Sequence, residues 1–286
     1  MSIWTELSYC LQDETIIRAL IVGGLIALCC AILGVILVLK RYAMIGDGLS
    51  HVAFGAMTIA MVLTVADMYF MLPITIIVAI LLIRLTNKGK VKNDSAIAML
   101  SVGSLAFGYL IVNLFSTSAN ISGDVCSTLF GSTSILTLST LDVWICVGLT
   151  LVVLVYFIFF HNKIFAMTFD EDFAKSTGVK TAIYNNIMAV IIGVVIVLAM
   201  KLVGSLLISA LIVFPALSAI RLFKSYKMVI IFSSIISVFN ALIGIMLSLV
   251  LGDRGTPVGA TIVVINIFVY FICWLVDIII HNVKRA

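Results

Sequence analysis

One pair of side chains in the sequence is able to bind a cation inside an apolar stretch. Asp47 and His51 are four residues apart, and on a helix two such side chains lie one above the other on the same face. The stretch that contains them, residues 44–66, is long enough to cross a bilayer. Placing a carboxylate at the centre of a membrane helix costs about 2.5–3.5 kcal/mol of insertion free energy. A carboxylate found there is therefore expected to have a function.

Two interpretations of the pair remain open at this point. A carboxylate oxygen and an imidazole nitrogen suit a borderline divalent cation such as zinc or manganese. Two ligands are too few for a closed zinc site, but a second copy related by a twofold axis would bring the number to four. A weak, incomplete site also lets a transported ion leave. The alternative is a helix-stabilising polar pair near the interface, because Asp47 lies six residues beyond Arg41.

The elements that must position this pair are membrane helices. The chain has 286 residues, of which 63% are hydrophobic and 10% charged, and its mean hydropathy is +1.31. These values are typical of a polytopic membrane protein. The apolar runs are continuous rather than alternating, which favours helices over a barrel. Three prolines and no long polar stretch leave no room for a soluble domain, so we predict one all-α transmembrane domain over residues 1–286.

The apolar segments and the positive charges predict the topology. Nine segments are predicted to span the membrane: 15–39, 44–66, 69–85, 94–115, 141–160, 182–200, 204–222, 228–251 and 258–281. Eight spans result if one segment is re-entrant. Residues 116–140, rich in Ser, Thr and Gly, are predicted to form an external loop. The positive-inside rule places Lys40 and Arg41, and the C-terminus, in the cytoplasm.

A short cytoplasmic helix is predicted over residues 168–178. Thr168 and Glu171 fit a capping box, and Gly178 is placed to end the helix. Phe169 and Phe173, at i and i+4, give it an apolar face on the water side. This helix either lies under its own protein or docks its aromatic face in a groove of a soluble partner.

A third segment, residues 201–216, combines small residues with a proline. Pro215 lacks an amide hydrogen and is predicted to kink its helix, while Gly204 and other small residues allow neighbouring helices to approach closely. Close packing explains this pattern, and a hinge that lines the transport pathway is the alternative. The sequence has no GxxxxGK[ST], GxSxG or HExxH motif, so any ATP hydrolysis would belong to another subunit.

In this order, these segments resemble the permease subunits of zinc/manganese-type ATP-binding-cassette (ABC) importers over nearly the whole chain. The resemblance rests on the following motifs: Gly34-Val35-Ile36-Leu37-Val38-Leu39-Lys40-Arg41, Gly46-Asp47-xx-Ser50-His51 with Gly55, Phe169-Asp170-Glu171-xx-Ala174-xxx-Gly178, Lys201-xx-Gly204-xx-Leu207, Phe214-Pro215-Ala216 and Pro257-Val258-Gly259-Ala260-Thr261.

The resemblance implies a non-enzymatic, homodimeric permease in a bacterial cell membrane. It would receive metal from an external solute-binding protein and be driven by two copies of a cytoplasmic ATPase. Asp47 and His51 would be the metal ligands in the pathway, and no cofactor would be bound permanently, since Zn²⁺ or Mn²⁺ is the cargo. The residues expected to couple to the ATPase are Phe169, Asp170, Glu171, Phe173, Ala174 and Gly178.

One departure from the family bears on the metal. Many manganese-type members carry a proline shortly after the histidine, whereas this chain has Val52-Ala53-Phe54-Gly55, which favours zinc. The alternatives are a manganese or iron ABC importer permease and a stand-alone secondary metal/proton carrier. The predicted docking helix argues against the carrier, because a lone carrier needs no docking face.

Overall fold

The protein is a bundle of helices, described here from a computed structural model over residues 13–63, 65, 67–87, 93–115, 138–250 and 256–283. Most of the predicted external loop lies outside these ranges. The helices are α2 (Glu14–Leu39), α3 (Ile45–Val62), α4 (Asp67–Asn87), α5 (Asn93–Phe115), α7 (Thr140–Phe169), α8 (Glu171–Ser176), α9 (Thr181–Val203), α10 (Ser205–Leu222), α11 (Tyr226–Val250) and α12 (Val258–Val283).

The helix lengths confirm the prediction of a polytopic membrane protein. In the described part of the chain, eight helices are long and apolar enough to cross a membrane, and α4 contributes a shorter apolar stretch, Met68–Arg84. These nine helices coincide with the nine apolar segments predicted from the sequence. The fold class and the expectation of eight to nine spans are therefore confirmed, and the chain is a multi-pass membrane protein.

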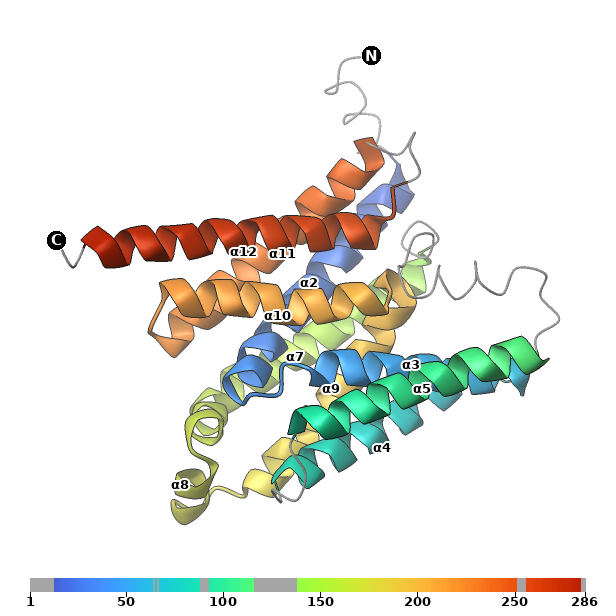
Figure 1. The fold of residues 1–286 in the computed structure, drawn as a ribbon, viewed down its shortest axis with the longest axis horizontal. Coiled ribbons are helices and arrows are strands. Elements are labelled where there is room, and N and C mark those ends of the chain that lie inside the picture. The colour runs from blue at the N-terminus through green and yellow to red at the C-terminus, as the bar shows by residue number, and fades with distance from the viewer. Residues whose placement is uncertain are drawn as a thin grey trace.

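The helix at the centre of the bundle is α2, which packs against α7, α9, α10 and α11 (Figure 1). It is buried on most of its surface, and no charged residue interrupts it between Arg18 and Lys40. On one side of this core, α3 packs between α4 and α5 and also contacts α9 and α10. On the other side, α12 lies against α10 and α11.

The outer faces of α5, α7 and α12 are covered with exposed apolar side chains. Examples are Met99, Phe107, Trp144, Phe159, Phe268 and Ile279. In water such faces would be unstable, but lipid tails are as apolar as these side chains. The pattern is therefore the one expected for helices that face a bilayer or another membrane subunit.

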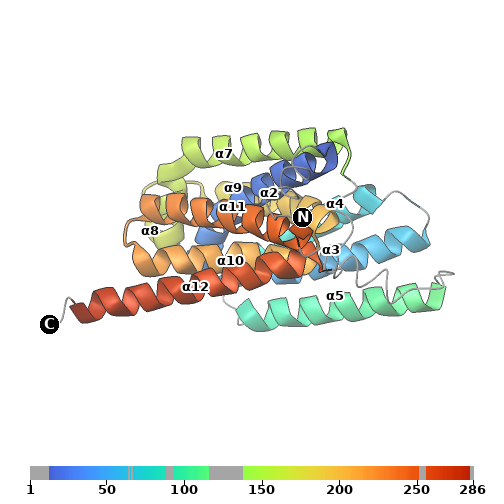
Figure 2. The ribbon, with the colours of Figure 1, turned by 90° about the horizontal axis from the view of Figure 1, so that it is seen from above.

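Basic residues gather at one end of the bundle, which we call the basic end and define by Lys40, Lys163, Arg221, Lys224 and Lys227. The short helix α8, the end of α10 and the end of α12 lie at this same end (Figure 2). The positive-inside rule assigns such an end to the cytoplasm. The cytoplasmic orientation of α8 remains a prediction that rests on this rule.

One membrane helix contains a bend that its sequence did not predict. Phe160 has non-helical backbone angles, φ −106° and ψ 15°, inside α7. No proline or glycine stands at this position, so neither usual residue cause of a kink applies. The helix then continues to Phe169, whereas we predicted that the span ends at residue 160.

Candidate functional site: an acid and an imidazole on one membrane helix

The predicted pair lies in the first two turns of α3. Nε2 of His51 is 3.6 Å from Oδ1 of Asp47, and both side chains are only partly exposed, His51 to 19% and Asp47 to 37%. The helical spacing of four residues brings them together, as the sequence predicts. Asp47 is in the first turn of its helix, where the helix dipole stabilises a negative charge.

A third polar group, on α5, contacts the pair. The Ser101 hydroxyl donates a hydrogen bond to Oδ2 of Asp47 at 3.3 Å, and Ser101 is buried. Sequence analysis missed this residue because the contact joins two helices and no spacing along the chain signals it. The contact holds one carboxylate oxygen in place and leaves the other directed toward His51.

The imidazole has a free coordination position. Nδ1 of His51 is buried and has no hydrogen-bond partner in the described part of the chain. A buried polar atom without a partner is uncommon and needs an explanation, such as a ligand that is bound part of the time. A nitrogen and a carboxylate oxygen on one face are the donors that zinc and manganese accept.

Within the described residues, no group of three or more His, Cys, Asp or Glu side chains is close enough to hold a metal ion. Asp47 and His51 therefore offer two strong donors from this part of one chain. A closed tetrahedral zinc site has four. Any further strong ligands must come from outside the described part of a single chain.

The segment of α10 between Gly204 and Pro215 packs beside this site. Ile212 of α10 lies so close to Gly46 that a Cβ on Gly46 would be 2.7 Å from its Cδ1 atom. Pro215 is buried, and α10 runs through it as a single helix from Ser205 to Leu222. The break in the chain falls instead at Gly204, whose φ of 93° and ψ of 155° separate α9 from α10.

The predicted coupling segment forms α8, a helix shorter than predicted. Asp170 is its N-cap, and its carboxylate accepts a hydrogen bond from the Phe173 amide. The predicted cap, Thr168, is wrong: this residue lies in the last turn of α7 and donates to the Ile164 carbonyl. Gly178 follows the helix with φ 85°, a backbone conformation that favours glycine.

One side chain of this segment is buried against the bundle, and two aromatic side chains are exposed. Ala174 is fully buried, while Phe169 and Phe173 are 60% and 61% exposed. Phe169 belongs to the end of α7, where its ring contacts Phe165 and Tyr226. Of these two rings only that of Phe173 belongs to α8, so the exposed aromatic surface at this end of the bundle combines residues of two helices.

A buried lysine connects α8 to the core. Nζ of Lys40, at the end of α2, lies 3.9 Å from a Glu171 carboxylate oxygen and donates a hydrogen bond to Asn185 of α9 at 2.9 Å. Burial lowers the pKa of Lys40, and the nearby Glu171 charge partly offsets this effect. The sequence placed Lys40 at the inner end of a span, but neither of its partners could be found from spacing.

Comparison with known proteins identifies the family. The chain matches the ABC 3 transport family over residues 12–277. It is 26% identical over 260 residues to the manganese transport system membrane protein MntC of Halalkalibacterium halodurans, an alignment that covers 91% of this chain and 85% of the relative. It is also 26% identical over 257 residues to the high-affinity zinc uptake system membrane protein ZnuB of Haemophilus influenzae, covering 90% and 95%.

Solved structures confirm the fold. The structure of PsaBC from Streptococcus pneumoniae in complex with Fab has a chain that superposes with a TM-score of 0.80 at 23% identity, covering 96% of this chain and 95% of that one. A metal-chelate type ABC transporter in an inward-facing conformation gives a TM-score of 0.71 at 17% identity, covering 91% and 85%. The family match and the fold define a polytopic membrane permease. The chain belongs to the ABC 3 transport family, and the predicted resemblance is confirmed.

Proposed function

We propose that this chain is the membrane-spanning permease of an ATP-driven divalent metal importer. The observation that carries the proposal is the Asp47–His51 pair on α3, two metal-binding side chains kept at a cost inside an apolar helix. Family membership supports the same function, because named relatives are manganese and zinc transport proteins. The permease itself has no enzymatic role, and a separate cytoplasmic ATPase supplies the energy.

The working unit is a homodimer in which each copy contributes Asp47 and His51. Two oxygens and two nitrogens then surround the ion, the number and kind of donors that zinc accepts in a tetrahedral site. The unpartnered Nδ1 of His51 supports a role as a ligand that is occupied only while an ion passes. The metal arrives from an external solute-binding protein and leaves toward the basic end.

Zinc is the proposed cargo. Two imidazoles and two carboxylates are a typical zinc donor set, whereas manganese prefers sites richer in oxygen. The absence of a proline in the run from Val52 to Gly55 supports the same choice. Manganese is the second candidate, because relatives named for manganese transport align over similar lengths.

Metal uptake tests the proposal directly. Radioactive zinc and manganese are supplied to cells that lack this chain and carry the wild type, His51→Ala or Asp47→Asn. We expect zinc accumulation with the wild type and a loss of at least about tenfold in both variants, with equal amounts of protein in the membrane. Asp142→Asn, which removes a carboxylate at the start of α7, is the control and keeps uptake. Wild-type uptake by His51→Ala would remove this residue from the pathway, and preferred manganese uptake would replace zinc as the cargo.

Co-purification separates the ATP-driven importer from a stand-alone carrier. When the chain is extracted from cells that express the whole system, we expect an ATPase to remain bound, with one ATPase copy for each copy of this chain. The α8 surface with Phe173 exposed supports this expectation. A chain that transports metal with no ATPase attached, and without ATP, would be a secondary carrier.

A further inference from the structure

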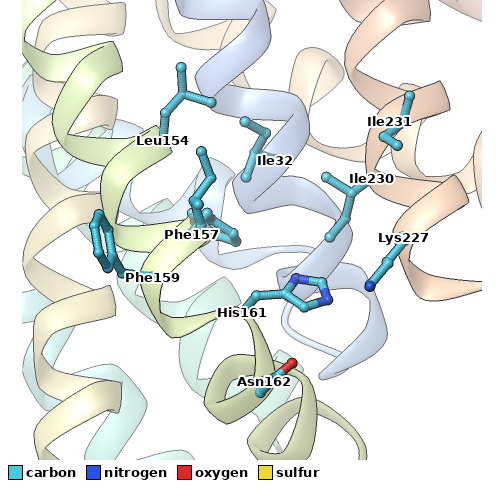
Figure 3. Close-up of a pocket in the computed structure, with 10 residues that line it drawn as sticks. Ile32, Leu154, Phe157, Phe159, His161, Asn162, Lys227, Ile230 and Ile231 are labelled. Atoms are coloured by element: carbon cyan, nitrogen blue, oxygen red, sulfur yellow. The ribbon is translucent and has the colours of Figure 1, made fainter.

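A cavity of about 480 Å³ opens between α2, α7 and α11 at the basic end, away from Asp47 and His51. Its lining residues are Ile32, Leu154, Phe157, Ile158, Phe159, His161, Asn162, Lys227, Ile230 and Ile231 (Figure 3). The volume falls within the range of about 300–1,000 Å³ that small-molecule sites occupy. Nothing in the transport mechanism proposed above uses this cavity.

The cavity has an apolar part and a polar part. Leu154, Ile32 and Ile231 lie toward one end, and His161, Asn162 and Lys227 lie toward the other (Figure 3). Since α7 and α11 run across the membrane, the first group is at the depth of lipid tails and the second is at the level of headgroups. The lining is therefore amphipathic along the direction of a lipid molecule.

The cavity opens on an apolar outer face of the bundle. Ile158 and Phe159 are 72% and 78% exposed on α7, and Ile231 is exposed on α11. These residues continue the apolar outer faces described above. A molecule can therefore enter sideways from the bilayer, which a water-soluble metabolite does not do.

The polar end carries positive charge that the protein does not neutralise. Lys227 is exposed and makes no ion pair or hydrogen bond within the described ranges, and no lining residue is acidic. Three other basic side chains at this end have partners: Lys40 donates to Asn185, Lys163 donates to the Tyr184 hydroxyl and Arg221 pairs with Asp277. His161 and Asn162 add further donors beside Lys227. The chemistry of this end fits a phosphate group.

We propose that this cavity binds one anionic phospholipid of the inner leaflet. One acyl chain lies along the aliphatic lining between α7 and α11, and the headgroup phosphate accepts hydrogen bonds from Lys227 and from His161 or Asn162. Basic pockets between membrane helices on the cytoplasmic side are known to recognise such headgroups. The charge at the mouth selects an anionic headgroup over a zwitterionic one.

The position of the cavity connects lipid binding to the coupling segment, an extension that rests on the proposed function. The non-helical Phe160 lies between the lining residues Phe159 and His161. The His161 ring contacts Tyr226, which in turn contacts Phe165 and Phe169 at the end of α7. A bound lipid would therefore contact α7 on both sides of its bend. The segment of α7 after the bend leads into α8.

Native mass spectrometry of the purified chain tests the binding without requiring transport. The protein in mild detergent is titrated with phosphatidylglycerol or with phosphatidylcholine, and the fraction that retains one lipid is measured. We expect preferential retention of phosphatidylglycerol by the wild type and about fivefold weaker retention by Lys227→Gln. Lys224→Gln is the matched control, because Lys224 is also exposed at the basic end but does not line the cavity. It should behave as the wild type does.

Three results would overturn the proposal: equal retention of the two lipids, an undiminished affinity in Lys227→Gln, or equal losses in Lys227→Gln and Lys224→Gln. The last would indicate a diffuse surface charge effect. A second variant, Leu154→Trp, fills the apolar part and should lower retention of phosphatidylglycerol while Lys227 is intact. Unchanged retention in this variant would also count against the site. All of these outcomes are independent of whether the chain carries metal or binds an ATPase.

Discussion

Lys40 and Glu171 connect the central helix α2 to the short helix α8. Their charged atoms are 3.9 Å apart, and the Lys40 side chain is only 8% exposed. Because Lys40 also donates to Asn185, α2, α8 and α9 meet at one ammonium group. The position of α8 relative to the membrane core is thus fixed by a buried contact rather than by a flexible loop.

Replacing Lys40 with methionine should destabilise the protein. Lys40→Met keeps the aliphatic length of the side chain but leaves Asn185 and Glu171 without their shared donor. We expect a loss of about 1–3 kcal/mol in the free energy of unfolding, measured as a lower melting temperature in detergent. Lys175→Met is the control, since Lys175 pairs with the same Glu171 but is half exposed, and such exposed pairs contribute about 0–1 kcal/mol. Equal melting temperatures for the two variants would refute the anchoring role of Lys40.

Placing a charge at Phe173 should prevent association with an ATPase. The side chain is exposed on α8, so Phe173→Asp is expected to leave insertion and melting temperature almost unchanged. It removes the apolar contact that a groove on a soluble partner would bury. Pull-down of the ATPase with tagged permease measures the effect, and Phe173→Leu, which keeps an apolar side chain, should retain binding. Normal association of Phe173→Asp would show that α8 docks by other residues or not at all.

Removing the Ser101 hydroxyl should weaken transport less than removing a ligand does. Ser101→Ala takes away the 3.3 Å hydrogen bond to Asp47, an interaction whose net contribution is about 1 kcal/mol. We therefore expect metal uptake to fall several-fold, by a rise in the metal concentration needed for half-maximal uptake. Ser104→Ala, on the same helix, is the comparison and should transport normally. A complete loss of uptake in Ser101→Ala would mean that the hydroxyl is itself a ligand.

Gly204 should be intolerant of any side chain. Its φ of 93° and ψ of 155° lie in a region that is essentially restricted to glycine, so Gly204→Ala is expected to cost on the order of 1–3 kcal/mol. The measurement is the melting temperature in detergent. Gly148→Ala provides the reference, because a Cβ at Gly148 meets no atom within 4 Å and a helical alanine is favoured over glycine. If both variants melt alike, Gly204 is not held in this conformation.

The sequence predicted the helices because each apolar run is long and each ends near charged or small residues. The sequence predicted the ends of helices less well where two nearby residues could each begin or end the helix. Thr168 and Asp170 are both good caps two residues apart, and the choice of Asp170 depends on where the backbone becomes extended, at φ −149°. Likewise α7 continues beyond residue 160 because the chain after Phe160 resumes a helix whose rings pack on Tyr226.

The candidate site was predictable only where its residues are neighbours in the sequence. Asp47 and His51 meet because four residues make about one helical turn, and the structure places them as expected. Ser101 and Lys40 act through contacts between helices, and such contacts depend on how the bundle packs. Metal binding by the pair and docking by α8 remain predictions that the experiments above address.

The one-residue connection at Gly204 limits how α9 and α10 can move. Two helices joined by a longer loop can slide or rotate past each other, but here only the two torsion angles of a single residue separate them. Gly204 lies at the opposite end of α9 from α8, so a displacement of α9 beside α8 would change the angle between α9 and α10 at this residue. Since Ile212 of α10 packs beside Gly46, next to Asp47, such a change of angle would alter the surroundings of the candidate site.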